Sequence, residues 1–310
     1  MDAAPPRRGN VLILMADAGE VEQVPVAPAA LGEGAIWNGA SQRLNWIDIG
    51  GRRVFTYDPA TGENRGCDVG QMVGTVVPRA RGGLVLALHE GFAALDPGSG
   101  RVEMWPRPPE HDPALVRFND GKCDPSGRFW AGTMALVKGP KPLGRLYRLD
   151  ANGTMRVMLR DVGTSNGVAW SLDRRTLYFI DTPLLRVDAF DYDDATGAIA
   201  NRRTVISIPP GIGRPDGSTL DAEGMLWVAM YEGWSVTRWN PQTGELLRTI
   251  RLPVARVTSC AFGGPELDTL YLTSARQNLT EPQLAAQPLA GGLFRVRPGV
   301  RGLPAFAFEG

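Results

Sequence analysis

Apolar and aromatic residues occur along this chain in short runs of about five, separated by segments rich in glycine, proline, asparagine and aspartate. Leu177-Tyr178-Phe179-Ile180 and Leu226-Trp227-Val228-Ala229-Met230 are typical runs, and each follows a turn signal. β-Branched and aromatic residues in runs of this length, bounded by turn formers, are typical of short β-strands. The pattern therefore predicts a chain built of many short strands rather than long helices.

The predicted strands repeat at intervals of roughly 40 to 50 residues, which is the spacing of β-propeller blades. The second strand of each repeat begins at a large apolar residue, namely Leu44, Leu84, Phe129, Leu177, Leu226 and Leu270. A third alternating strand follows each of them at 54–57, 92–95, 146–149, 187–190, 236–239 and 293–296. We therefore predict an all-β fold, a six-bladed β-propeller forming one domain over residues 20–310. A two-sheet sandwich with irregular repeats is the alternative.

The ends of the chain carry three further expectations. Residues 1–19 do not fit the repeat and are predicted to be a poorly ordered extension. The apolar segment from Val21 to Ala27 is expected to close the ring as the outer strand of the last blade. One short helix is predicted near Pro282, with Thr280 as its N-cap.

Charge and cysteine usage exclude several classes of protein. The 33 Lys and Arg residues balance the 33 Asp and Glu residues, so we expect neither nucleic acid nor a membrane surface as a partner. Three widely spaced cysteines form neither a disulfide framework nor a zinc cluster. The apolar run from Val11 to Ala16 is too short for a signal sequence or a spanning helix. We expect a cytoplasmic protein, a monomer or small homo-oligomer, that acts on a small molecule.

Polar residues recur at one phase of the repeat. In a propeller the first strand of each blade lines the central channel, so residues of equal phase lie at equal height. Counting back ten or eleven residues from the second-strand markers gives Glu33, Asn119, Asn166 and Asp216, and gives Val73 and Ser259 in the second and sixth blades. Two carboxylates and two amides suit a hard divalent cation. We predict one such ion at one mouth of the channel, Ca²⁺ by preference, with Mg²⁺, Mn²⁺ or Zn²⁺ as alternatives.

These residues also match turn dipeptides and one catalytic motif. Glu33-Gly34, Asn166-Gly167 and Asp216-Gly217 are also common turn dipeptides. Gly163 to Gly167 matches the G-x-S-x-G pattern of serine hydrolases, but here the motif lies between strands, and a histidine base is missing, since His89 and His111 are expected to be bystanders. Neither an H-E-x-x-H motif nor a phosphate-binding glycine loop occurs in the sequence.

Several of these segments resemble one known family. Leu31 to Trp37, Arg117 to Lys122, Ser165 to Gly167, Pro215 to Gly217 and Gln287 to Phe294 are similar in order and spacing to the gluconolactonase, regucalcin and senescence-marker-protein family. The likeness runs from about Glu20 to about Val296.

The resemblance implies a metal-dependent hydrolase that opens sugar lactones to aldonic acids. It places the metal ligands on Glu33, Asn166 and Asp216, with Asn119 as a further ligand or a substrate contact. It also makes Asp216 the general base and Arg117 a substrate-binding residue. The alternative for Arg117 is an ordinary salt bridge to a neighbouring loop. Trp37, Tyr231 and Trp234 are expected either to wall the pocket or to pack within blades.

One position departs from the family pattern. Animal members carry an acidic sugar contact after the Gly-Thr-Met of the third blade, where this chain has Val137. Sugar recognition is therefore expected to differ. The alternatives to a sugar lactonase are a metal-assisted esterase or lactonase with a non-sugar substrate and a non-catalytic calcium-binding propeller.

Overall fold

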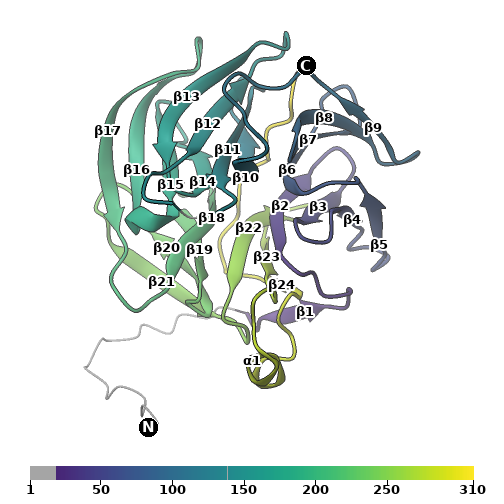
Figure 1. Ribbon diagram of the computed structural model, residues 1–310. Helices are drawn as coiled ribbons and strands as arrows, with labels where there is room; N and C mark the ends of the chain where they lie inside the picture. Colours follow the sequence, from purple (N-terminus) through teal and green to yellow (C-terminus); the bar gives the residue numbers. More distant parts are fainter. Residues whose placement is uncertain (1–18, 138) are drawn as a thin grey trace.

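The computed structural model describes residues 19–137 and 139–310. The predictions made for residues 1–18 lie outside this range. Within the described residues, 24 strands form six four-stranded sheets arranged around a central axis (Figure 1). The predicted six-bladed β-propeller is confirmed, and the two-sheet sandwich is excluded.

Each blade begins at the axis and ends at the outer surface. The innermost strands are β2 (Gly32–Asn38), β6 (Val73–Pro78), β10 (Val116–Cys123), β14 (Ser165–Trp170), β18 (Arg214–Leu220) and β22 (Val257–Gly263). The second strands are β3 (Arg43–Asp48), β7 (Leu84–Leu88), β11 (Phe129–Ala135), β15 (Thr176–Asp181), β19 (Leu226–Tyr231) and β23 (Thr269–Ser274). All neighbouring strands within a blade are antiparallel, so the innermost strands all start at the same mouth of the channel.

The third strands are β4 (Arg53–Tyr57), β8 (Gly91–Asp96), β12 (Gly144–Leu149), β16 (Arg186–Asp193), β20 (Ser235–Trp239) and β24 (Leu293–Val296). The outer strands are β5 (Asn64–Asp68), β9 (Arg101–Met104), β13 (Met155–Val162), β17 (Ala198–Ser207), β21 (Leu246–Arg251) and β1 (Glu22–Val24).

The ring is closed by its N-terminal strand, as the sequence predicted. β1 is the outer strand of the sixth blade, where Glu22 pairs with Arg295 and Val24 with Leu293 of β24. The blade thus combines the two ends of the chain, and Val24 is buried in the core. This pairing gives β24 a hydrogen-bonded neighbour on both sides.

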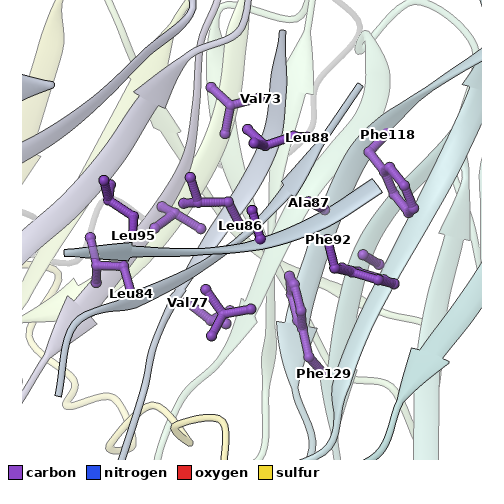
Figure 2. Packing of buried hydrophobic residues seen from close by; sticks show 14 of the residues in the cluster. Val73, Val77, Leu84, Leu86, Ala87, Leu88, Phe92, Leu95, Phe118 and Phe129 are labelled. Atoms are coloured by element: carbon purple, nitrogen blue, oxygen red, sulfur yellow. The ribbon is translucent and has the colours of Figure 1, made fainter. Parts of the chain in front are cut away.

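Apolar side chains fill the spaces between neighbouring blades. Figure 2 shows Phe92 of the second blade facing Phe118 and Phe129 of the third. The ring centroids are 5.1 Å and 5.4 Å from that of Phe92, within the range for favourable aromatic pairs. The inner strands are buried along almost their whole length, because each blade packs one face against each of its two neighbours. This packing fixes the innermost strands around the channel.

Two elements lie outside the repeat. The α-helix α1 (Glu281–Ala286) has the predicted N-cap Thr280, whose side chain accepts a hydrogen bond from the backbone N–H of Gln283. The C-terminal segment passes from the sixth blade across the mouth opposite the strand starts. It forms a bridge at Asp221 and Gly302 and a second at Arg79 and Phe308, and it ends beside the second and third blades (Figure 1).

Candidate metal centre and active site

All six innermost strands have a β-bulge or an irregularity of register near the mouth where they start. The breaks lie between Glu33 and Ile36, Val73 and Thr75, Phe118 and Gly121, Asn166 and Val168, Pro215 and Ser218, and Val257 and Ser259. A bulge re-aims the side chains next to it. Glu33, Asn119, Asn166 and Asp216 all lie at or within these breaks, and all four are buried. The repeat phase therefore identified a real structural ring.

The glycines that follow these polar residues serve close packing rather than hairpin turns. A Cβ atom on Gly167 would lie 2.4 Å from Oγ of Ser218, and one on Gly217 would lie 2.9 Å from Cα of Ser259. In both cases the obstructing residue belongs to the innermost strand of the next blade. Gly34 has a φ of 58°, the left-handed region that favours glycine. The interpretation of these pairs as turn dipeptides is therefore wrong.

The second and sixth blades differ from the other four. Val73 stands at the start of its break as Glu33 and Asn166 do, so the phase count holds in the second blade, where the residue is apolar. In the sixth blade Ser259 lies on the far side of the break, and Val257 stands at its start. The hydroxyl of Thr258, inside that break, donates to the backbone oxygen of Gly32 and contacts Oγ1 of Thr273 at 2.9 Å. The four predicted polar donors therefore come from four blades.

The two amides are joined by direct hydrogen bonds. Nδ2 of Asn119 donates to Oδ1 of Asn166 at 2.8 Å and also to the backbone oxygen of Ser165. Nδ2 of Asn166 donates to Oγ1 of Thr182, in the 3₁₀ turn η1 (Thr182–Leu184), at 2.7 Å. The Thr182 hydroxyl in turn donates to the backbone oxygen of Pro215. This network links three blades and turns the oxygen of Asn166 toward its neighbours at the channel mouth.

Arg117 lies against the same network. Its Nη1 donates to Oδ1 of Asn119 and to the backbone oxygen of Phe118, both at 2.8 Å. Burial lowers the pKa of its guanidinium, and the charges of Glu33 and Asp216 oppose that shift. None of the ion pairs found among the described residues involves Arg117, so the alternative of a loop salt bridge is wrong.

The carboxyl groups at the mouth repel one another. Burial raises the pKa of Glu33 to about 8, and the nearby Asp120 carboxylate adds to the shift. Burial, with the charges of Glu33 and Asp120, also raises the pKa of Asp216 well above its ordinary value. Oδ1 of Asp216 is buried and has no hydrogen-bond partner among the described residues. A buried carboxylate oxygen without a partner is costly, so this atom is placed for a ligand.

A divalent cation fits this set of residues. Within the described residues, no group of three or more His, Cys, Asp or Glu side chains is arranged to hold a metal, so amide oxygens must complete any such site. Glu33, Asp216 and Oδ1 of Asn166 supply hard oxygen donors. The charge of a cation would also relieve the repulsion that raises the two carboxyl pKa values. Each amide oxygen accepts one hydrogen bond here, Oδ1 of Asn166 from Asn119 and Oδ1 of Asn119 from Arg117, and each keeps a second lone pair for a ligand.

Sequence reasoning missed several residues near the ring. Asp120 lies directly beside Asn119, and burial raises the pKa of its carboxyl. Nζ of Lys122, whose pKa burial lowers, donates to the backbone oxygen of Ser218 at 2.6 Å. Asp120 and Lys122 fall within the quoted Arg117 to Lys122 motif, which was the available signal. Arg214 and Thr182 had no such signal, because Arg214 meets Glu232 only through the pairing of two strands and Thr182 reaches Pro215 of the next blade.

The three aromatic candidates differ in their surroundings. Trp37 is buried and stacks on Tyr271 with ring centroids 6.1 Å apart, so it belongs to the core. Tyr231 ends β19 at the channel mouth, opposite Arg214. Trp234 is 40% exposed and follows Tyr231 in the loop after β19. His111 is buried against Phe118 and contacts the backbone oxygen of His89, as expected of a bystander.

Comparisons with known proteins identify relatives of this chain. Residues 31–276 match the model of the SMP-30/Gluconolactonase/LRE-like region. Regucalcin of Xenopus laevis is 40% identical over 296 residues, covering 94% of this chain and 99% of that protein. A solved luciferin-regenerating enzyme has a TM-score of 0.86 and 34% identity, with 94% and 99% of the two chains covered. A calcium-binding protein, regucalcin, from Agrobacterium tumefaciens has a TM-score of 0.87 and 27% identity, with 94% and 98% covered.

Proposed function

Because the chain belongs to the SMP-30/gluconolactonase/LRE-like family, we propose that it is a divalent-metal-dependent lactonase that opens a sugar lactone to the aldonic acid. The observation that carries the proposal is the convergence of Glu33, Asn166 and Asp216 at one mouth, with Oδ1 of Asp216 unpartnered. Arg117 lies beside them without an ion pair among the described residues.

Glu33, Asn166 and Asp216 would hold the cation, with Asn119 as a further ligand or substrate contact. When bound, such an ion polarises a carbonyl oxygen and lowers the pKa of a coordinated water. Oxygen donors of this kind suit Ca²⁺ best, and Mg²⁺, Mn²⁺ or Zn²⁺ are alternatives. The calcium-binding description of the Agrobacterium tumefaciens protein supports Ca²⁺.

The protein's own residues divide the remaining work. Asp216 accepts the proton of the attacking water as general base, and burial keeps its carboxylate away from bulk solvent. Arg117 faces the position where negative charge develops on the carbonyl oxygen and later pairs with the carboxylate product. Asn119, held between Arg117 and Asn166, donates and accepts hydrogen bonds that orient the substrate hydroxyls.

Two alternatives use the same site. A metal-assisted esterase or lactonase acting on a non-sugar substrate would need the same cation and base. A non-catalytic calcium-binding propeller would need the ligands but not an unpaired Arg117 next to them. Arg117 therefore favours an enzyme, since its half-buried guanidinium forms no ion pair among the described residues and lies where it can bind an anionic group.

We propose a cytoplasmic location because the three cysteines are unpaired. Cys67, Cys123 and Cys260 are all free, and unpaired thiols are typical of the reducing cytoplasm. No helix in the described part of the chain has the length and apolar character needed to cross a membrane.

The test is a proton-release assay over a panel of aldonolactones and simple lactones. The protein is stripped with EDTA, and Ca²⁺, Mg²⁺, Mn²⁺ and Zn²⁺ are added back singly. We expect hydrolysis of at least one aldonolactone to return with a metal, and Asp216→Asn to lower kcat by about 10²-fold or more. Hydrolysis that is unchanged in Asp216→Asn would contradict the proposed base. Tight metal binding without turnover of any lactone would favour the calcium-binding propeller.

A further inference from the structure

A second group of charged residues lies at the channel mouth beside the proposed base. Arg214 is two residues before Asp216 on β18 and pairs in register with Tyr231 of β19. Tyr231 in turn forms a bridge with Arg256, which comes just before β22. The guanidinium carbons of Arg214 and Arg256 lie 5.1 Å and 5.3 Å from the centroid of the Tyr231 ring. Both guanidinium groups therefore lie against the ring of Tyr231.

A single carboxylate serves both arginines. Glu232 lies 2.8 Å from Nη2 of Arg214 and 3.5 Å from Nη2 of Arg256. The other hydrogen bond of Arg256 goes from Nη1 to the backbone oxygen of Gln277. The Nε atoms of both arginines are buried and have no hydrogen-bond partner among the described residues. Two guanidinium groups thus share one negative charge, and each keeps a free donor.

The charges of the arginine pair itself do not cancel. Among the described residues, Glu232 is the one carboxylate paired with Arg214 and Arg256, so one positive charge of the pair remains. The other acidic residues at this mouth are engaged elsewhere. Glu33 and Asp216 would hold the cation, Asp120 lies near Lys122, and the carboxylates of Asp48 and Asp181 accept backbone N–H groups. The arginine pair therefore has a place for an anion.

The opposite side of the mouth carries a connection that would not repel an anion. The connection from β11 to β12, residues 136–143, contains no acidic residue. Its first side chains, Leu136 and Val137, are exposed. Arg117 pairs with Met134 as Arg214 pairs with Tyr231, so this connection and the arginine pair lie at the same mouth.

We propose that the substrate is a lactone with a second anionic group, a carboxylate or a phosphate, which Arg214 and Arg256 bind while Asp216 acts at the ester. This inference rests on the proposed lactonase activity and names its substrate class. Arginine suits the role because its planar fork binds both oxygens of a carboxylate or phosphate. Stacking on Tyr231 holds the two forks in place before the substrate arrives. A neutral lactone would leave the positive charge that Glu232 does not offset without a partner.

The test compares lactones that differ in one group. D-Glucono-1,4-lactone and D-glucaro-1,4-lactone share a ring and differ only in having a hydroxymethyl or a carboxylate at carbon 6. D-Glucono-1,5-lactone and its 6-phosphate form the second pair. With Ca²⁺-loaded protein, we expect kcat/KM for the anionic member of one pair to exceed that of the neutral member by about tenfold or more. The pair that shows the difference identifies the anion.

Variants connect that preference to the arginines. Arg214→Met and Arg256→Met keep the apolar stem and should reduce the preference about tenfold, while the neutral lactone changes less than about twofold. Arg214→Lys should retain part of the preference. Arg203→Met is the matched control, because Arg203 is 47% exposed and pairs with one carboxylate, Asp191, far from the mouth, whereas Arg214 is 42% exposed. A thermal scan confirms that each variant is folded.

The outcomes separate this inference from the proposed activity. Equal rates for neutral and anionic lactones, or an equal loss for both in Arg214→Met, would overturn the inference and leave the lactonase standing. If no lactone is hydrolysed, calorimetry with D-glucarate and D-gluconate decides instead. Tighter binding of the dianion that Arg214→Met abolishes would support the arginine site, whereas equal affinities would reject it.

Discussion

At the scale of single residues, the channel mouth stores electrostatic repulsion that a cation would relieve. Glu33, Asp120 and Asp216 are buried close together, and in the described part of the chain the positive charges that act on them are those of Arg117, Lys122 and Arg214. A raised carboxyl pKa means that the folded protein favours the protonated form. The cation-free protein should therefore respond to pH in a direction that follows from these shifts.

We predict that EDTA-treated protein becomes less stable as the pH rises from about 5 to 8. The pKa of Glu33 is 4.5 in its unperturbed state and about 8 when folded. Between these values the folded state binds more protons than the unfolded state, so its stability falls by at most about 1.4 kcal/mol per pH unit for this group. Urea unfolding across this range measures the slope.

Two controls make that result specific. Glu33→Gln should reduce the slope and leave a remainder from Asp120 and Asp216, whose pKa values are also raised. Saturating Ca²⁺ should remove the part of the slope that comes from its ligands, because the bound ion keeps their carboxylates ionised. Stabilisation by Ca²⁺ should be larger at pH 8 than at pH 6, since protons compete with the metal. A pH slope that is the same with and without Ca²⁺ would show that Glu33 is not a ligand.

A second prediction concerns Arg117. Arg117→Met should lower kcat by roughly 10- to 100-fold, because it removes the charge that faces the developing oxyanion. Its effect on Ca²⁺ affinity should be small, since Arg117 forms its hydrogen bond with Asn119 and not with Glu33, Asn166 or Asp216. Steady-state kinetics and calcium titration on the same sample separate the two effects. A large loss of Ca²⁺ affinity with unchanged kcat would assign Arg117 a structural role.

At the scale of elements, the repeat predicts most of the fold because strand hydrophobicity and turn residues are local properties. The starts of the second strands, from Leu44 to Leu270, were all predicted within one residue of the structure. Bulges are not visible in the same way, which is why the count reaches Ser259 in the sixth blade, where Val257 stands at the start of the break. The arginine pair at Arg214 was missed because Tyr231 and Arg256 reach it only through register between strands and blades.

One recurring hairpin explains why the repeat is so regular. Asp124 is fully buried and accepts hydrogen bonds from the backbone and Nε of Arg128, from Nε1 of Trp130 and from the hydroxyl of Tyr192. Asp221 of the fifth blade does the same for Trp227 and Arg238. The sequence pattern of an aspartate, a glycine turn and a tryptophan therefore marks a hairpin whose aspartate forms a buried ion pair with an arginine.

We predict that Asp124→Ala destabilises the protein by about 3–5 kcal/mol, because it removes the nearer carboxylate partner of the buried Arg128 guanidinium and leaves the longer 3.6 Å ion pair with Asp194. Asp191→Ala is the matched control, since its ion pair with Arg203 lies at the surface and should contribute about 1 kcal/mol or less. Urea unfolding measures both. Because Asp124 lies at the opposite end of β10 from Arg117, kcat of folded Asp124→Ala should stay within about twofold. A decrease of less than about 1 kcal/mol in the free energy of unfolding would show that the buried ion pair of Asp124 contributes little to stability.

At the scale of the whole molecule, the ring holds the four proposed site residues in place because they come from four different blades. Glu33, Asn119, Asn166 and Asp216 can converge only if every blade keeps its angle to the next. The sixth blade is the point where this depends on the chain termini, since β1 supplies its outer strand. Stability of the ring and geometry of the site are therefore linked through a strand of three residues.

We predict that a chain beginning at Ala27 loses both stability and activity, whereas one beginning at Gly19 keeps them. The shorter chain lacks the pairing of Glu22 with Arg295 and their 2.8 Å ion pair, and it leaves the position of Val24 in the core empty. A cavity and an unpaired strand edge together cost about 3–5 kcal/mol, and should lower Tm by roughly 5–10 °C. Scanning calorimetry of the two chains, each with and without Ca²⁺, measures this difference.

If β1 closes the ring, a synthetic peptide of residues 19–27 should restore part of the lost Tm when it is added to the shorter chain. Equal Tm values for the two chains would instead mean that the sixth blade is held by its contacts with the first and fifth blades alone.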